Sequence, residues 1–276
     1  LFGLDIRRTR PVARRSAFQA AGTGLTLSDW TTTPTTIDSA LRLQLRTLRT
    51  RSRQQARNNA YARKFLHLVG VNVIGPSGIR MQAKPRGEDG RLDLLAAQAI
   101  EDAWTDWTES KLCDIERRRT FQQMQWADSM SAGRDGEFLL RIVADRSSDN
   151  PYGITLQTLD PDLLDTDHNV DMGGGACIRM GIEFNGNHRA LAYHVRQVTS
   201  WDSMAGPLYS PKRLRVPADE IIHGYRTEEP GQSRGLPWMT AALYRLKQIG
   251  ATEDAAACRP ARFARDRRAP PGHRAA

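Results

Sequence analysis

Cysteine is scarce in this chain of 276 residues, and no apolar run is long. The three cysteines, Cys113, Cys177 and Cys258, form neither a CxxC pair nor a zinc-ligand spacing, and their odd number favours a reducing compartment. No stretch approaches the ~18 apolar residues of a membrane span. The Arg-rich N-terminus also lacks the apolar segment of a secretory signal. We therefore expect neither a disulfide framework nor a membrane partner.

Positive charge is concentrated at the two ends of the chain. Residues 1–64 have a net charge of +10 and residues 256–276 one of +5, whereas residues 65–255 have one of −6. A domain that grips duplex DNA concentrates positive charge on its folded surface. We therefore expect any nucleic-acid contact to come from the basic ends, or to be weak. The first 20 residues resemble a transit peptide in composition, but a basic disordered arm is the favoured interpretation.

The composition divides the chain into four parts. Residues 1–37 are rich in Arg, Thr, Pro and Gly and predict a disordered basic arm. Residues 38–237 predict a mixed α/β domain, and residues 238–257 predict the start of a long helix. Residues 258–276 contain mainly Arg, Pro, Ala, Gly and His, and predict a disordered tail. That helix has no stop signal before the tail, which suggests a reading-frame change; a genuine basic tail is the alternative.

Hydrophobic periodicity predicts an α+β fold with antiparallel hairpins. Asp38 is the expected N-cap of the first helix, and Asn185-Gly186-Asn187 is a hairpin turn signal. A basic helix is expected to continue into a hairpin over 70–83 that turns at 75–78. The expected helices are 41–48, 53–68, 92–109, 114–132 and one from 238. The expected strands are 154–159, 177–184, 190–198, 213–216, 220–225 and 137–144.

One acidic cluster suggests chemistry. It comprises Asp160, Asp162, Asp165, Asp167 and His168. Oxygen ligands at such density suit a divalent cation. The spacing lacks the glycine and the distal Glu of an EF-hand loop, however, and turn-forming Asp residues explain the cluster more simply.

The remaining candidate residues also fail to form a known constellation. The glycines at 173–175 lack the Lys-Ser/Thr of a phosphate loop, and the histidines have no partners at ligand spacing. A loop salt bridge or an interface contact explains the charged group that includes Arg234. The side chains concerned are His67, His194, His223, Ser200, Ser203, Glu228, Glu229 and Arg234. We predict no catalytic, cofactor-binding or metal-binding residues, no cofactor and no enzyme activity.

Seven segments, taken in order, resemble the lambda-like family of tailed-bacteriophage portal proteins. The stretch GQSRGLPWM within 220–249 and the helix after it are the most specific part, and the likeness runs from about residue 38 to residue 254. The segments are ARNNAYARKF (56–65), GVNVIGPSGIRMQA (70–83), TDW (105–107), DIERRRTFQQMQ (114–125), DGEFLLRIV (135–143), LQTLDPDLLD (156–165) and EIIHGYRTEEPGQSRGLPWMTAALYRLKQI (220–249).

This resemblance implies a structural subunit of a ring, typically a dodecamer, at the portal vertex of the virion. The implied partners are further copies of the chain, the terminase large subunit, major capsid and scaffold proteins, a head–tail adaptor and double-stranded DNA. Residues 38–237 would build the wing, and the helix from 238 would lead to the channel. The implied locations are the capsid vertex and, during assembly, the host cytoplasm. Complete members continue with clip and crown parts, and by this resemblance the chain is expected to end before them.

Cyclic assembly requires two different complementary patches on each subunit. The basic helix 53–64 and the acidic segment 160–171 are the predicted pair. Two other classes of function remain as alternatives. One is a nucleic-acid-binding module that uses the basic termini, and the other is a hydrolytic enzyme built on Asp160–His168.

Overall fold

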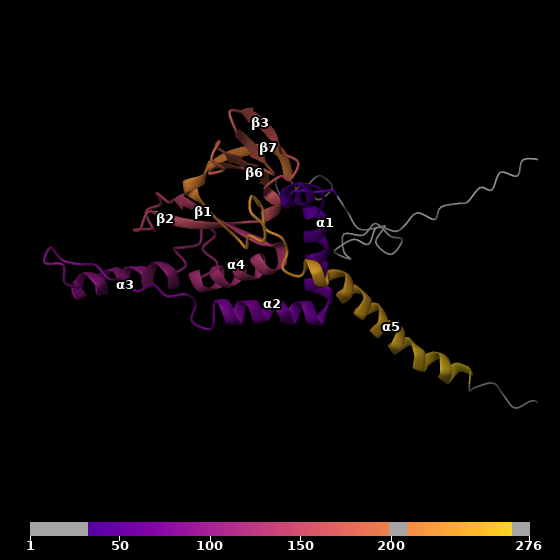
Figure 1. Ribbon diagram of the computed structural model, residues 1–276. Coiled ribbons are helices and arrows are strands. Elements are labelled where there is room, and N and C mark those ends of the chain that lie inside the picture. Colours follow the sequence, from indigo (N-terminus) through magenta and orange to yellow (C-terminus); the bar gives the residue numbers. More distant parts are fainter. Residues whose placement is uncertain (1–32, 199–208, 267–276) are drawn as a thin grey trace, which may run out of the picture. The chain divides into compact units, whose positions relative to one another are not determined.

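The computed structural model describes residues 33–198 and 209–266 (Figure 1). Its helices are α1 (Ile37–Asn58), α2 (Ala60–Val73), α3 (Leu94–Glu109), α4 (Phe121–Asp135) and α5 (Leu243–Asp266). Its strands are β1 (Glu137–Ala144), β2 (Ile154–Leu159), β3 (Val170–Gly173), β4 (Ala176–Arg179), β5 (Ile182–Phe184), β6 (Ala190–Val198), β7 (Tyr209–Pro217) and β8 (Ile221–Tyr225). Short 3-10 turns are η3 (Pro161–Leu163), η4 (Ala218–Glu220) and η5 (Thr240–Ala242). All these elements belong to one unit, Thr36–Ala276.

The strands form two antiparallel sheets, which confirms the α+β class. One sheet has the order β2-β1-β8, and the other has the order β3-β4-β5-β6-β7. The central strand β1 pairs with a sequence neighbour, β2, and with a distant strand, β8. The predicted turn at Asn185 joins β5 to β6, where the Asn185 side chain accepts hydrogen bonds from the N–H groups of Asn187 and Arg189. Among the described residues, no helix is both long and apolar enough to cross a membrane.

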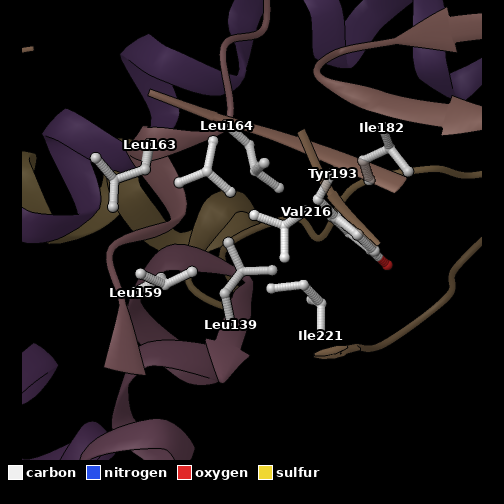
Figure 2. Packing of buried hydrophobic residues seen from close by; sticks show 9 residues of the cluster. Leu139, Leu159, Leu163, Leu164, Ile182, Tyr193, Val216 and Ile221 are labelled. Carbon is white, nitrogen blue, oxygen red and sulfur yellow. The ribbon is translucent and has the colours of Figure 1, made fainter. Parts of the chain in front are cut away.

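The largest apolar cluster joins the two sheets (Figure 2). Leu139 of β1 and Ile221 of β8 face Tyr193 of β6 and Val216 of β7, and the leucines of η3 and the residue after it close one side. Burying each large apolar side chain stabilises the fold by roughly 1.5–3 kcal/mol relative to leaving it exposed. This cluster therefore holds the sheets together as one body.

A second cluster fixes α3 and α4 on the three-stranded sheet. Trp107 and Cys113 are buried with Met124 of α4, and Trp104 packs edge-on against Phe121 with ring centroids 5.4 Å apart. Burial raises the pKa of the Cys113 thiol to about 11, which keeps it protonated.

The first two helices divide at a different place from the predicted one. Helix α1 runs unbroken to Asn58, because Thr50 and Ser52 bond backbone carbonyls and do not end the helix. Asn59 then caps α2 by accepting hydrogen bonds from the N–H groups of Tyr61 and Ala62. Thr36, and not the predicted Asp38, caps α1.

The predicted hairpin over 70–83 is wrong. Helix α2 continues to Val73, because Leu66 and Val69 lie on its buried face while Val71 and Val73 stay exposed. The chain turns at 75–78 as expected, but no second strand follows. Instead the Gln125 side chain bonds both the N–H and the C=O of Ile79. A short run of apolar β-branched residues does not distinguish a helix from a strand.

Three further boundaries differ from the predictions. Helix α4 begins at Phe121, after a Thr120–Gln123 capping box, and not at residue 114. The predicted strand 177–184 divides into β4 and β5 at Met180 and Gly181, both of which have positive φ. The last helix runs from 243 to 266, past the predicted end at 257; Ala and Arg, which favour helix, are frequent there. Residues 267–276 and most of the arm 1–37 lie outside the described residues.

Candidate functional site

A buried ion network lies where helix α1, strand β1 and the loop after β8 meet. Glu137 and Arg234 are both fully buried, and Arg234 Nη2 donates to Glu137 Oε1 at 2.6 Å. Arg49 Nη2 lies 2.6 Å from the same oxygen, and His223 Nε2 lies 3.2 Å from Oε2. The backbone N–H of Gly235 also donates to Oε2. One carboxylate thus holds groups from three distant segments.

Arg234 satisfies its remaining donors on backbone carbonyls. Its Nη1 donates to Met180 and Leu164, and its Nη2 donates to Pro161. Burial alone would raise the pKa of Glu137, but the guanidinium groups of Arg234 and Arg49 hold that pKa well below its usual range. The carboxylate therefore stays ionised inside the protein. A planar guanidinium with five donors suits this many-sided contact better than a lysine would.

A second, partly exposed layer uses part of the predicted acidic cluster. Arg53 Nε donates to Asp135 at 2.7 Å, and its two Nη groups donate to Asp162 at 2.8 Å and to Asp160 at 2.7 Å. Arg49 also lies 3.4 Å from Asp162. These aspartates therefore neutralise arginines of α1 within the same chain. Asp160 and Asp162 of the segment 160–171 thus have partners within the chain, and its contact with a neighbouring copy stays a prediction.

The rest of the acidic cluster has structural partners as well. Asp165 binds Arg196 and Arg213, and these contacts lower its pKa to about 2 even though burial alone would raise it. The ring of His168 packs on that of His194, with centroids 5.0 Å apart. Asp167 stays exposed. Among the side chains that the structure describes, no three of His, Cys, Asp or Glu come together as metal ligands.

The other candidate residues are spread over the fold. His194 pairs with Glu183 at 3.1 Å, and His67 packs against Trp126. The three glycines 173–175 form the positive-φ turn between β3 and β4. Glu228 pairs with Arg226, whereas Arg234 pairs with Glu137 in the buried network. Ser200 and Ser203 lie outside the described residues.

The second half of the loop after β8, residues 232–239, is largely buried although it is polar, whereas residues 226–231 are exposed. Gln232 donates to the Arg234 carbonyl, and Ser233 bonds the Asp38 carboxylate through both its N–H and its hydroxyl. Loops normally lie on the surface, because buried backbone groups need partners. Here the side chains of the loop supply those partners. The sequence signal was the Gln-Ser-Arg run between two glycines, which predicts only a turn.

Two glycines allow this loop to cross the end of α4. Gly136 ends α4 with φ +92°, and a Cβ atom there would lie 2.4 Å from the carbonyl carbon of Leu236. A Cβ atom on Gly235 would lie 2.1 Å from the Gly136 oxygen. Real Cβ atoms do not come so close to backbone atoms. Both positions therefore require glycine for the close approach.

An apolar groove of about 580 Å³ lies between α2, α4 and the three-stranded sheet. Val69 and Val73 of α2 line one side, and Phe138 of β1 lines another. Asp128 is buried in this groove, and its Oδ1 atom has no hydrogen-bond partner. The Nε1 atom of Trp238, which also lines the groove, has none either. Buried polar atoms usually have hydrogen-bond partners, so these two atoms are the polar groups that a molecule entering the groove would meet.

Replacing Asp128 with asparagine is expected to stabilise the fold in a pH-dependent way. Burial raises the pKa of Asp128 to about 7, so the folded state retains a proton that the unfolded state loses above pH ~4. Wild-type stability therefore falls as pH rises from ~4 to ~7. We expect Asp128→Asn to gain about 3 kcal/mol at pH 8 and much less at pH 5. Thermal denaturation at both pH values measures this, with the exposed Asp219→Asn as the control. Equal gains at both pH values would contradict it.

A smaller basic cavity of about 320 Å³ lies at the break between α1 and α2. Arg53, Arg57, Arg63 and Arg134 line it. Arg53 and Arg134 are held by Asp135, whereas Arg57 and Arg63 are exposed and have no ion pair among the described residues. This cavity therefore offers Arg57 and Arg63 to a carboxylate from another molecule.

Fold and site together define a structural scaffold, in which buried ion pairs lock helices to sheets. The chain belongs to the lambda family of phage portal proteins, whose pattern matches residues 23–261. This confirms the family resemblance predicted from the sequence.

Three relatives are similar over most of the chain. A probable portal protein of Halomonas phage phiHAP-1 is 34% identical over 74% of this chain. Portal protein B of Escherichia phage lambda and the portal protein of Escherichia phage N15 are each 25% identical over 83% of it. The chain spans 39% of the first relative's length and 44% of the length of the other two.

Proposed function

We propose that this chain is the wing-type part of a portal subunit, which assembles with copies of itself into a ring at one vertex of a phage head. The family match over residues 23–261 carries this proposal. Portal proteins are structural components of the head, and we propose no catalytic role. The buried network around Glu137 supports a mechanical role, because it fixes α1, β1 and the loop after β8 as one rigid block.

The proposed ring surrounds the path by which double-stranded DNA enters and leaves the head. The net charge of −6 over residues 65–255 supports such a conduit, because strong phosphate contacts would slow the moving duplex. The proposed partners are the terminase large subunit during packaging, the major capsid and scaffold proteins around the ring, and a head–tail adaptor after packaging. Assembly would take place in the host cytoplasm and end in the virion.

The basic N-terminal segment favours a second candidate, in which the chain binds nucleic acid through its ends. We expect weak duplex binding that depends on the arginines at 7, 8, 10, 14 and 15. Replacing these five with serine should reduce the slope of log K against log salt by about 4 to 5. Fluorescence anisotropy of a labelled duplex at several salt concentrations measures this. Tight binding that survives the change would place a DNA-gripping surface on the folded body and count against the conduit.

Ring contacts are expected to use the basic cavity of Arg57 and Arg63. Asp160 and Asp162 already pair with Arg53 of their own chain. The acidic residues expected to face Arg57 and Arg63 of a neighbouring copy are therefore the exposed Asp167 and Asp171. Reversing charge with Arg57→Glu and Arg63→Glu should weaken oligomers, because two attractive pairs become repulsive. Native mass spectrometry compares this variant with Arg146→Glu, which changes an arginine outside the cavity. An unchanged oligomer distribution would reject this contact.

A further inference from the structure

Helix α3 presents an apolar tip at its start, where exposed leucine side chains lie beside a short backbone pairing with residues 85–87. Leu94 and Leu95 are 75% and 87% exposed, and Leu92 just before the helix is 53% exposed. Exposed leucines that cluster in this way mark an interaction site more often than scattered single ones do. We call residues 91–95 the α3 tip. Its remaining members are Arg91, which is exposed, and Asp93, which caps the helix.

The α3 tip cannot fold back onto its own chain while α3 stays helical. The other end of α3 is fixed, because Trp107 is buried and packs with Phe121 at the start of α4. Thirteen helical residues separate Leu94 from Trp107, which places the tip about 20 Å further along the helix axis. Figure 1 shows α3 extending beyond the start of α4, with its first turn at the far end. The arm is therefore rigid and points outward.

The groove lined by Val69, Val73, Phe138, Asp128 and Trp238 has the complementary properties. It is apolar, residues of α2 and α4 line it, and its lining residue Val73 is 55% exposed. Its two unsatisfied atoms require opposite partners: the Asp128 carboxylate accepts a hydrogen bond, and Trp238 Nε1 donates one. An apolar peptide segment with a cation beside it supplies all three partners that the groove needs: apolar side chains for its lining, a donor for Asp128 and a backbone carbonyl for Trp238.

We propose that the groove of one copy receives the α3 tip of a neighbouring copy. Leu94 and Leu95 fill the apolar part of the groove, Arg91 pairs with Asp128, and a backbone carbonyl of the tip accepts from Trp238. Arg91 is available for this contact, since its ion pair with Asp89 is exposed and 3.9 Å long. This contact deepens the proposed ring assembly and rests on it.

The contact has the symmetry that a ring requires. Tip and groove are different surfaces, so each copy donates one and accepts the other. A heterologous contact of this kind continues from copy to copy until the ring closes, whereas a self-complementary patch stops at a dimer. The basic cavity of Arg57 and Arg63 is a separate surface, and the tip–groove contact does not depend on it.

Disulfide trapping between two differently tagged forms of the chain tests this contact. One form carries Leu95→Cys and the other carries Val73→Cys, and in both forms Cys177 and Cys258 are replaced by serine. We expect mild oxidation to give a mixed disulfide between the two forms. A matched control pairs the Val73→Cys form with Leu43→Cys, an equally exposed leucine (78%) on α1, and should give none. The tip variant Leu94→Asp, added to the Leu95→Cys form, should abolish the mixed disulfide without lowering the Tm.

Each outcome of the disulfide experiment either supports or overturns the tip–groove contact. No mixed disulfide, or equal amounts with the Leu43→Cys control, would overturn it and leave the groove to another segment or to another protein of the head. Native mass spectrometry of the wild-type chain is read separately. Oligomers larger than dimers without the mixed disulfide would reject the tip–groove contact alone, whereas a mixed disulfide from a chain that never exceeds a dimer would reject the closed ring alone.

Discussion

Replacing Arg234 with alanine is expected to lower the free energy of unfolding by about 3–5 kcal/mol, the usual cost of breaking a buried ion pair from one side. The change leaves Glu137 ionised and fully buried, and it removes donors from the carbonyls of Met180, Leu164 and Pro161. Urea denaturation followed by tryptophan fluorescence measures the loss. Many domains have only about 5–15 kcal/mol in total, so the expected loss removes a large share of the stability.

The matched control for this experiment is Arg226→Ala. Arg226 lies in the same loop and pairs with Glu228, but its side chain is 63% exposed. We expect a loss below about 1 kcal/mol there, as for other exposed pairs. Similar losses for the two variants would show that burial of the Arg234 pair contributes nothing, and would contradict the rigid block proposed here.

Acid should weaken the same network. The pKa of Glu137 is lowered in the fold, so its ionised form contributes stability above the ordinary carboxyl pKa, and this contribution is lost as pH falls through the lower folded value. The difference in stability between the wild-type chain and Glu137→Gln should therefore narrow only under strongly acidic conditions.

The second large effect is expected from Gly136→Ala. A methyl group there would overlap the backbone of Leu236 and Pro237, and the φ of +92° adds conformational strain. The loop after β8 would have to move off the end of α4, at a cost of about 3 kcal/mol or more. Thermal denaturation measures the loss of Tm. Displacement of the loop would also move Gly235 and Arg234 away from Glu137. The hydrogen bonds and ion pairs to Glu137 should therefore be lost as well.

Gly231→Ala separates the two causes. Gly231 has a φ of +80°, close to that of Gly136, but nothing lies within 4 Å of its added Cβ. This control therefore reports the conformational cost alone, about 1 kcal/mol. Equal losses at 136 and 231 would mean that the two chain segments do not cross as closely as the structure shows.

Sequence reasoning worked where the local pattern determines the structure. Strands β1, β2 and β6 alternate in hydrophobicity, and the Asn185 turn signal is local, so these elements lie where they were expected. Sequence reasoning failed where contacts between distant segments determine the secondary structure. The apolar run up to Val73 fits a strand as well as a helix, and its packing against α4 selects the helix.

The candidate site was largely beyond prediction, because its partners are far apart in the chain. Arg234 and Glu137 are 97 positions apart, and Arg53 and Asp160 are 107 positions apart. No periodicity connects such residues. The acidic cluster was interpreted as turn-forming aspartates, and its pairing with α1 of the same chain was missed. The groove was missed too, since it exists only once α2, α4 and the sheet come together.

Native mass spectrometry of the purified chain over a range of concentrations tests the central claim, that this is a ring-forming portal subunit. The account predicts oligomers that grow beyond the dimer and end at one closed stoichiometry, with nothing larger. A chain that remains monomeric at every concentration, or that stops at a dimer, would contradict it.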